Sequence, residues 1–269
     1  MCFDLIIEPS RAFSVLKPQK TGILKANTSM EGAYKMKKVW ICGDSILRGV
    51  VWSEEQKRYT NSCAIGYDAI ESRFGITLSN CSRFGYTLSK GAEYLFSRLD
   101  RGETCDIAIL EYGGNDSDFN WAEISSSPKE EHFSHTAPKD FEAYYRRMIS
   151  ALRGRGILPV LCNLVPVCSG RYLDWVSQKG LSKENILQWL GEEDVIFRYQ
   201  EQFSKLVEHI ASDEGCPLVD LRTSFLNEDM ESYFCIDGIH PSIEGQRLLG
   251  KSLMQLPTGL FEENRALFA

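Results

Sequence analysis

The sequence predicts an α/β protein in which a parallel β-sheet is covered by helices on both faces. Segments typical of buried strands alternate with segments of helical spacing about five times along the chain, the order found in sheets with helical crossovers. Turns that contain glycine or asparagine follow several of these strand segments, at Gly43, Gly85, Gly113–Asn115 and Asn163. Because the carboxyl ends of parallel strands meet at one edge of the sheet, we expect these turns to lie close together.

The first half of the chain begins with an extension and then enters the predicted sheet. Residues 1–35 show no clear periodicity, and we interpret them as an N-terminal extension that could pack on a main domain at 36–269. The segment from Trp52 to Ile70 is irregular before it becomes helix-like. Periodicity predicts two strands, one helix and a further strand here, in the order Val39–Cys42, Ile76–Cys81, Leu88–Leu99 and Cys105–Leu110.

The second half continues the alternation but contains two segments without a clear pattern. We interpret 117–139 and 168–191 as insertions, because loops of this length in a compact domain are usually lids or binding loops. Ser242 is a suitable N-cap for the last helix, which we expect to run through Met254. The other predicted elements are helix Phe141–Arg153, strand Ile157–Leu164, helix Glu192–Ser212 and strand Pro217–Leu221.

Composition excludes several classes of protein. The chain has 269 residues, of which 43% are hydrophobic and 25% charged, and its formal net charge of −7 disfavours binding to a nucleic-acid backbone. No stretch approaches the roughly 20 apolar residues of a membrane span. Asp4 and Glu8 interrupt the apolar run at the start, so we do not expect a signal peptide. The nine cysteines form no Cys-x-x-Cys pair, and we expect a cytoplasmic protein.

Ser45 stands at the turn that follows the first predicted strand, in Gly43-Asp44-Ser45. This position lies at the carboxyl edge of the sheet and near a helix N-terminus, where backbone N–H groups point outward. A serine there could be a nucleophile if a base and an oxyanion hole meet it. On this stretch alone, helix capping by Asp44 or Ser45 explains the pattern equally well.

Asp237-x-x-His240 is the candidate for the base and the group that orients it. Gly238 and Pro241 allow a sharp bend, so that the aspartate could accept a hydrogen bond from the imidazole while the second ring nitrogen faces Ser45. In isolation, a histidine that packs near a helix start explains this motif better. Gly85 and Asn115 could approach a ligand through a backbone N–H and a side-chain amide, although both are also ordinary turn residues.

Taken together, four blocks resemble those of the SGNH hydrolases, also called GDSL esterases and lipases. They are Gly43-Asp44-Ser45, Gly85, Gly113-Gly114-Asn115-Asp116 and Asp237-Gly238-Ile239-His240. The resemblance spans 37 to about 255, and Ile46 replaces the leucine that often follows the serine. It implies a three-layer α/β/α, flavodoxin-like fold with a five-stranded parallel sheet.

The resemblance also implies roles for individual residues. Ser45 would be the nucleophile, His240 the base and Asp237 the residue that orients it. The oxyanion hole would consist of the Ser45 and Gly85 N–H groups and the Asn115 side-chain amide. Gly91, and less well Asn80, are rivals for the Gly85 position.

The expected activity is hydrolysis of a short-chain acyl ester, with acetyl favoured, of a carbohydrate or small metabolite through an acyl-enzyme on Ser45. An acyltransferase with the same residues, a lysophospholipase- or thioesterase-like hydrolase, and a non-catalytic binding protein remain alternatives. The α/β-hydrolase elbow is excluded because Gly-x-Ser-x-Gly would need glycine where Leu47 stands. Asp44 and four aromatic residues of the two insertions could contact substrate, although the aromatics could instead pack a lid: Phe119, Trp121, Tyr172 and Trp175.

We expect no cofactor and no metal. His132 and His135 could ligate a metal together with a carboxylate, but the serine and proline residues around them favour an ordinary loop. The expected partner is a small-molecule or carbohydrate ester, with no nucleic acid and no membrane. The sequence leaves the oligomeric state open.

Overall fold

The computed structural model describes residues 36–178 and 180–261, and a five-stranded parallel sheet forms its centre. The strand order confirms the predicted sheet, and it is the flavodoxin-like order in which the second strand lies outside the first. The predicted extension at 1–35 lies outside the described residues. Across the sheet the strands are β4 (Ile76–Asn80), β1 (Lys37–Gly43), β5 (Ile107–Glu111), β6 (Leu158–Cys162) and β7 (Leu218–Val219).

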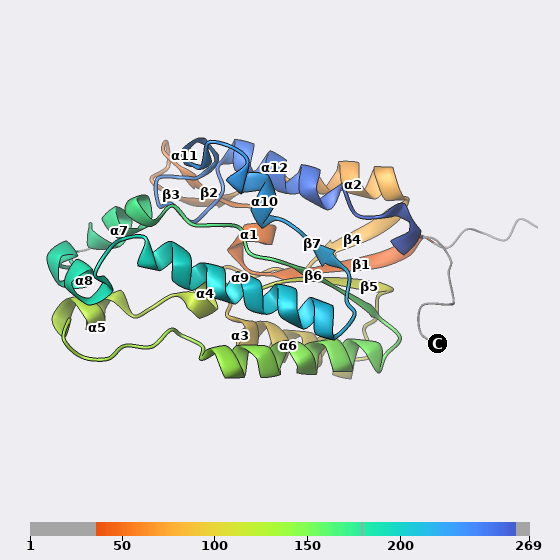
Figure 1. Ribbon diagram of the computed structural model, residues 1–269. Coiled ribbons are helices and arrows are strands. Elements are labelled where there is room, and N and C mark those ends of the chain that lie inside the picture. The colour runs from red at the N-terminus through yellow and green to blue at the C-terminus, as the bar shows by residue number, and fades with distance from the viewer. Residues whose placement is uncertain (1–35, 179, 262–269) are drawn as a thin grey trace, which may run out of the picture. The chain divides into compact units, whose positions relative to one another are not determined.

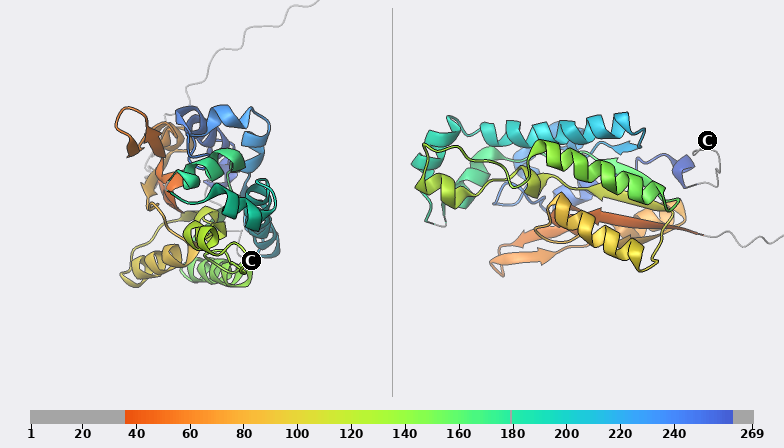
Figure 2. Two further views of the ribbon diagram at one scale, coloured as in Figure 1. Left: turned by 90° about the vertical axis from the view of Figure 1, so that its left-hand side faces the viewer. Right: turned by 90° about the horizontal axis from the view of Figure 1, so that it is seen from below.

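Helices cover both faces of this sheet, which confirms the three-layer arrangement (Figures 1 and 2). Alternation along the strands explains it: Trp40 of β1 points into one core, and Ile41 points into the other. The first core contains side chains from α3 (Leu88–Asp100), α6 (Pro138–Arg153) and α9 (Val195–Asp213). The second contains side chains from α2 (Tyr67–Phe74), α10 (Arg222–Leu226) and α12 (Ile243–Leu253).

The two predicted insertions contain helices. They hold α5 (Trp121–Ser126), α7 (Ser169–Ser177) and α8 (Lys183–Leu190), which gather beyond the carboxyl ends of the strands (Figure 1). Apolar residues of these helices pack together in a third buried cluster, which explains why the segments are ordered despite their weak sequence pattern. The cluster contains Phe119, Trp121, Ile124, Tyr172, Leu173, Val176, Ile186, Leu190 and Ile196.

A β-hairpin replaces part of the irregular segment that the sequence indicated after Ser45. Its antiparallel strands are β2 (Val50–Ser53) and β3 (Arg58–Asn61), in which Trp52 lies opposite Tyr59. The strands are four residues each, too short to give a periodic signal. The two aromatic rings contact each other edge to face and both contact Trp175 of α7, so tertiary packing stabilises the hairpin.

The remaining elements are short. Within the described part of the chain, no helix combines the length and apolar character needed to cross a membrane. Single helical turns complete the part of the fold that the structure describes. They are α1 (Ser45–Arg48), α4 (Gly114–Ser117), α11 (Met230–Tyr233) and a 3₁₀ turn at Thr258–Leu260.

Candidate active site

Ser45 is the first residue of α1, at the end of the central strand β1. Asp44 caps this helix by accepting a hydrogen bond from the Ile46 N–H at 2.9 Å, so the capping role belongs to Asp44 and leaves the Ser45 hydroxyl free for other contacts. Gly43 makes the tight turn possible, since a Cβ there would lie 2.9 Å from the carbonyl oxygen of Glu111 on β5. The strand end therefore presents Ser45 at the sheet edge, as the motif predicted.

His240 reaches Ser45 from the loop before α12. Its Nε2 lies 2.9 Å from the Ser45 Oγ, and its Nδ1 lies 2.7 Å from Asp237 Oδ2. The other oxygen of Asp237 accepts hydrogen bonds from the Ile239 and His240 N–H groups, each at 3.0 Å. The structure thus brings together the serine, histidine and aspartate that the sequence singled out, although Ser45 and His240 are 195 residues apart.

Two features fix Asp237. Gly238 has φ of +73°, and a Cβ there would lie 2.6 Å from the Cys168 carbonyl oxygen, so only glycine fits the turn after the aspartate. Burial raises the pKa of the Asp237 carboxyl, but hydrogen bonds from His240 and Tyr59 outweigh burial and leave this pKa below its usual value. The buried carboxylate is therefore held as an anion beside the imidazole.

Tyr59 is a contact that the sequence reasoning missed. Its hydroxyl donates to Asp237 Oδ2 at 2.7 Å, the same oxygen that faces His240, and its ring centroid lies 4.8 Å from the imidazole. Phe84 stacks on the other side of the site, with its ring nearly parallel to the His240 ring at 5.9 Å. No sequence motif marks Tyr59, because it enters through a hairpin without a clear strand pattern.

Gly85 and Asn115 both line the cavity beside Ser45. Gly85 has φ of +69°, while a Cβ there would meet no atom within 4 Å, so the backbone conformation and not crowding favours glycine. Asn115 Nδ2 donates to Asp44 Oδ2 at 2.9 Å and to the Tyr86 carbonyl oxygen at 3.1 Å. These bonds fix the amide at the cavity wall, and it would bind an oxyanion by sharing or exchanging one of them.

The two rivals for the Gly85 position have other roles. Gly91 lies inside α3, and a Cβ there would come within 2.4 Å of the Tyr112 ring, so this glycine permits close packing. Asn80 donates to the Leu47 carbonyl oxygen at 2.8 Å and accepts from the Ser82 N–H at 2.9 Å. Packing explains Gly91 and hydrogen bonds to the backbone explain Asn80, so neither residue needs a role in the oxyanion hole.

Three buried carboxyl groups lie beneath this edge of the sheet. Burial raises the pKa of Asp44 and of Asp116 to about 6. Burial, together with the neighbouring Asp44, raises the pKa of Glu111 well above its usual value, and Glu111 Oε2 has no hydrogen-bond partner among the described residues. Asp116 accepts from the Leu88 N–H at 2.8 Å and from the Thr136 hydroxyl, which ties the start of α3 to the turn after β5.

A cavity of about 330 Å³ extends from Ser45 toward α7 and α9. Asp44 and the four aromatic residues predicted as substrate contacts, Phe119, Trp121, Tyr172 and Trp175, all line it. Several of these aromatic residues also belong to the third buried cluster, so wall formation and lid packing are compatible. The remaining wall is part polar and part aliphatic, and its aliphatic residues are Ile46, Leu164, Val165, Val167, Val176, Ile196 and Ile239.

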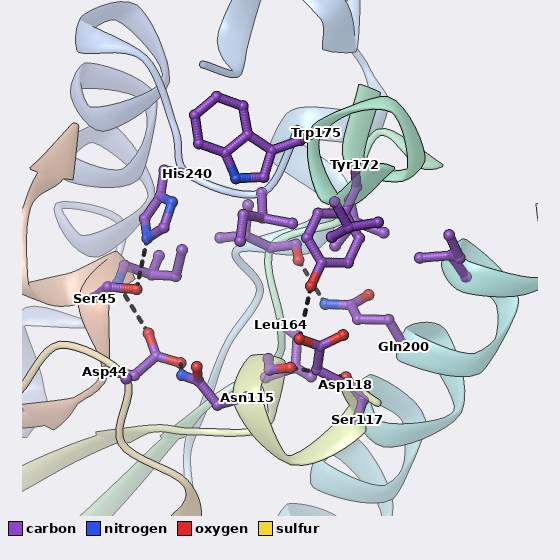
Figure 3. Close-up of a pocket in the computed structure, with 18 of the residues that line it drawn as sticks. Asp44, Ser45, Asn115, Ser117, Asp118, Leu164, Tyr172, Trp175, Gln200 and His240 are labelled. Carbon is purple, nitrogen blue, oxygen red and sulfur yellow. Dashed lines mark hydrogen bonds between the residues drawn. The ribbon is translucent and has the colours of Figure 1, made fainter. Parts of the chain in front are cut away.

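The cavity wall contains three carboxyl groups. Asp44, Glu111 and Asp118 line it, and among its described lining residues there is no lysine or arginine. Figure 3 shows Ser45, His240 and Asn115 at one end, and Asp118, Tyr172 and Gln200 at the other. The wall therefore offers hydrogen-bond acceptors and no cation to an anionic substrate.

The two histidines considered as metal ligands do not line this cavity. His132 Nε2 contacts the Ser127 carbonyl oxygen at 2.9 Å, and His135 Nδ1 contacts that of Asn115 at 3.0 Å. The part of the chain that the structure describes contains no group of three or more His, Cys, Asp or Glu side chains arranged to hold a metal ion.

Comparison with known proteins identifies the family of the chain. A model of the GDSL-like lipase/acylhydrolase family matches residues 41–248. The chain belongs to this family. Its match extends from the strand before Ser45 into the helix after His240, so it includes every block on which the resemblance was based.

Solved structures show the same fold at low sequence identity. A lipase/acylhydrolase from Enterococcus faecalis is 17% identical with a TM-score of 0.57, and the alignment covers 86% of this chain and 100% of that one. An acetylxylan esterase from Geobacillus stearothermophilus, solved as a catalytic mutant, is 18% identical with a TM-score of 0.55 and coverage of 82% and 95%. No curated protein matches the chain by sequence.

Proposed function

We propose that the chain is a serine esterase. The supporting observation is the continuous path of hydrogen-bonding contacts from the Ser45 Oγ to His240 Nε2 and from His240 Nδ1 to Asp237. In this arrangement the imidazole accepts the serine proton while the carboxylate holds the ring and stabilises its charged form. Membership of the acylhydrolase family makes an ester the expected substrate.

The proposed reaction proceeds through an acyl-enzyme. Ser45 Oγ attacks the ester carbonyl carbon, and His240 takes the hydroxyl proton and then gives it to the leaving alkoxide. A water molecule, deprotonated by the same imidazole, attacks the acyl-enzyme and releases the acid. The Ser45 and Gly85 N–H groups and the Asn115 amide would stabilise the oxyanion in both steps.

In the proposed reaction the two halves of an ester lie in different surroundings. In the tetrahedral intermediate one oxygen faces the oxyanion donors, and the leaving oxygen must face His240 Nε2 to receive its proton. The remaining substituent, the acyl group, is left to enter the cavity. The alcohol then lies at the mouth, where Phe84 is 52% exposed and can stack on a sugar ring.

Charge and volume narrow the substrate class. A wall with carboxyl groups and no cation opposes phosphate-bearing esters, which disfavours phospholipids and acyl-coenzyme A thioesters. A cavity of about 330 Å³ is at the small end of the roughly 300–1,000 Å³ range of ligand pockets. We therefore propose an uncharged ester of a small or carbohydrate alcohol, with an acyl group that can be larger than acetyl; acetylxylan esterases share the fold.

The proposal is tested by trapping and turnover. A fluorophosphonate probe should label the wild-type protein at Ser45 and leave the Ser45→Ala variant unlabelled. With 4-nitrophenyl esters from acetyl to decanoyl, kcat/KM should peak between acetyl and hexanoyl. Turnover by Ser45→Ala at the wild-type rate would refute the nucleophile, and a preference for octanoyl or longer chains would refute the substrate size.

A further inference from the structure

The end of the cavity opposite Ser45 is polar, although aliphatic and aromatic side chains line the wall beside it. Asp118 Oδ2 accepts a hydrogen bond from the Tyr172 hydroxyl at 2.6 Å, and Asp118 Oδ1 accepts one from Trp121 Nε1 at 2.8 Å. Gln200 of α9 points toward the same place (Figure 3). A carboxylate among apolar side chains at the end of a cavity favours a hydrogen-bond donor on the ligand.

No lysine or arginine in the part of the chain that the structure describes forms an ion pair with Asp118. Burial raises the pKa of its carboxyl, while hydrogen bonds and the nearby His135 act in the opposite direction. Its two oxygens have four lone pairs, and the contacts from Tyr172, Trp121 and the Phe119 N–H use three of them. The carboxylate can therefore accept a further hydrogen bond from a group in the cavity.

A buried cation, Arg222, lies behind Gln200, across the cavity end from Asp118. The buried Arg222 donates through Nη1 to Gln200 Oε1 at 2.7 Å, while Gln200 Nε2 donates to the Val165 carbonyl oxygen at 2.7 Å. Arg222 is 3% exposed and does not itself line the cavity. With a carboxylate on one side and a guanidinium behind the other, the cavity end favours a neutral dipolar group over an ammonium group.

We propose that this end of the cavity is a recognition subsite for a hydroxyl group on the acyl half of the substrate, with Asp118 as its hydrogen-bond acceptor. The inference rests on the proposed esterase function, which places the acyl group in the cavity. An acyl chain without a donor would displace water from the carboxylate and leave its remaining lone pair without a hydrogen bond, which disfavours such analogues. The preferred substrate is thus an ester of a hydroxy acid.

A matched pair of substrates tests the proposal on the wild-type enzyme. Methyl 3-(4-hydroxyphenyl)propanoate should have a kcat/KM at least about ten-fold above that of methyl 3-phenylpropanoate, as one hydrogen bond to a charged group implies. Its 4-methoxy analogue should not share the advantage. The same comparison applies to methyl 6-hydroxyhexanoate, methyl hexanoate and the 6-amino ester, among which the hydroxy ester should be best.

Variants then assign the selectivity to Asp118. In Asp118→Asn the ratio of kcat/KM between the hydroxylated ester and its parent should fall about ten-fold. Because the ratio is measured on one preparation, it does not depend on the fraction of folded enzyme. Asp174→Asn is the matched control, since Asp174 is exposed on α7 and pairs with Lys183 outside the cavity, and its ratio should equal that of the wild type.

The possible outcomes distinguish a failure of the hydroxyl subsite from a failure of the proposed esterase activity. If none of the esters is hydrolysed by a Ser45-dependent route, the esterase proposal fails. If the parent esters are hydrolysed but the hydroxyl gives no advantage, or if Asp118→Asn lowers both rates equally, the subsite is refuted and the esterase remains. Preference for the amino ester, or selectivity only for hydroxyls on the alcohol half, as in acetylated sugars against acetylated deoxy sugars, would also overturn it.

Discussion

The cavity has two walls that are built in different ways. The wall at the strand ends consists of polar groups joined by hydrogen bonds, with Ser45, His240 and Asp237 at its centre. The opposite wall consists of aromatic and aliphatic side chains on α5, α7 and α9, together with the carboxyl group of Asp118. In our proposals the first wall carries out the reaction, and the second selects the substrate by its shape and by Asp118.

The largest test of this comparison removes the reacting groups. Ser45→Ala and His240→Ala should each lower kcat for 4-nitrophenyl butanoate by about 10⁴-fold or more, because both groups act in one proton transfer. The two substitutions together should cost little more than either alone. Far-ultraviolet circular dichroism should be unchanged. The exposed Ser97 of α3 offers the control Ser97→Ala, and an additive loss in the double variant would contradict a shared role.

The variant Asn115→Ala tests how much the side-chain amide in the first wall stabilises the oxyanion. Asn115→Ala should lower kcat by about 10²–10³-fold, the usual loss for one oxyanion donor, with a much smaller change in KM. The amide also holds Asp44 and the Tyr86 carbonyl oxygen, so the melting temperature should be measured beside the rate. Asn227→Ala on the surface is the control. A loss confined to KM would show that Asn115 contacts substrate in the ground state only.

Tyr59 lies where the two walls meet, and we propose it as a positioning residue for Asp237. Tyr59→Phe keeps the ring against His240 and removes the hydrogen bond that helps to lower the pKa of Asp237. The carboxylate then holds the imidazole proton more tightly. We expect a fall in kcat of about three- to ten-fold, as the loss of one such bond implies, with the acid limb of the pH–rate profile moved to higher pH.

The control for this residue is Tyr233→Phe, which removes a surface hydroxyl that donates to Glu228. The pH–rate profile separates positioning from packing. A lower rate with an unmoved acid limb would mean that Tyr59 only supports the aromatic contacts with Trp52 and Trp175.

The same division explains how much the sequence could predict. The sheet, its parallel order and the strand-end positions of Ser45, Gly85 and Asn115 follow from patterns of a few consecutive residues, because backbone periodicity fixes where each strand ends. Asp237 and His240 are three positions apart in one turn, so their mutual geometry is also local. These are the parts that short motifs can encode.

Tyr59, Asp118 and Gln200 could not be found in this way. Tyr59 depends on a hairpin whose strands are four residues each, and its partner Asp237 is 178 residues away. The role of Asp118 depends on Tyr172, 54 residues further along on a helix that tertiary packing stabilises. Substrate recognition by such residues is a property of packing between distant segments, and no local pattern signals it.

We expect the smallest effect on catalysis from Glu111, whose protonation affects the stability of the folded protein. Burial, with Asp44 nearby, raises the pKa of Glu111, so the folded protein keeps a proton that the unfolded chain loses above pH of about 4.3. Unfolding then releases a proton, and the wild-type free energy of unfolding falls as pH rises, by about 1.4 kcal/mol for each pH unit in which Glu111 alone stays protonated in the folded state.

Glu111→Gln removes this titration and still offers an oxygen to the Asp44 N–H, so the variant should gain stability over the wild type as pH rises from 4 to 8, with the two nearly equal at pH 4. Urea unfolding at several pH values measures the difference, and Glu130→Gln on the surface is the control. If the wild type is as stable as the variant at pH 8, Glu111 is ionised in the folded protein and the strand-end wall carries its charge without loss of stability.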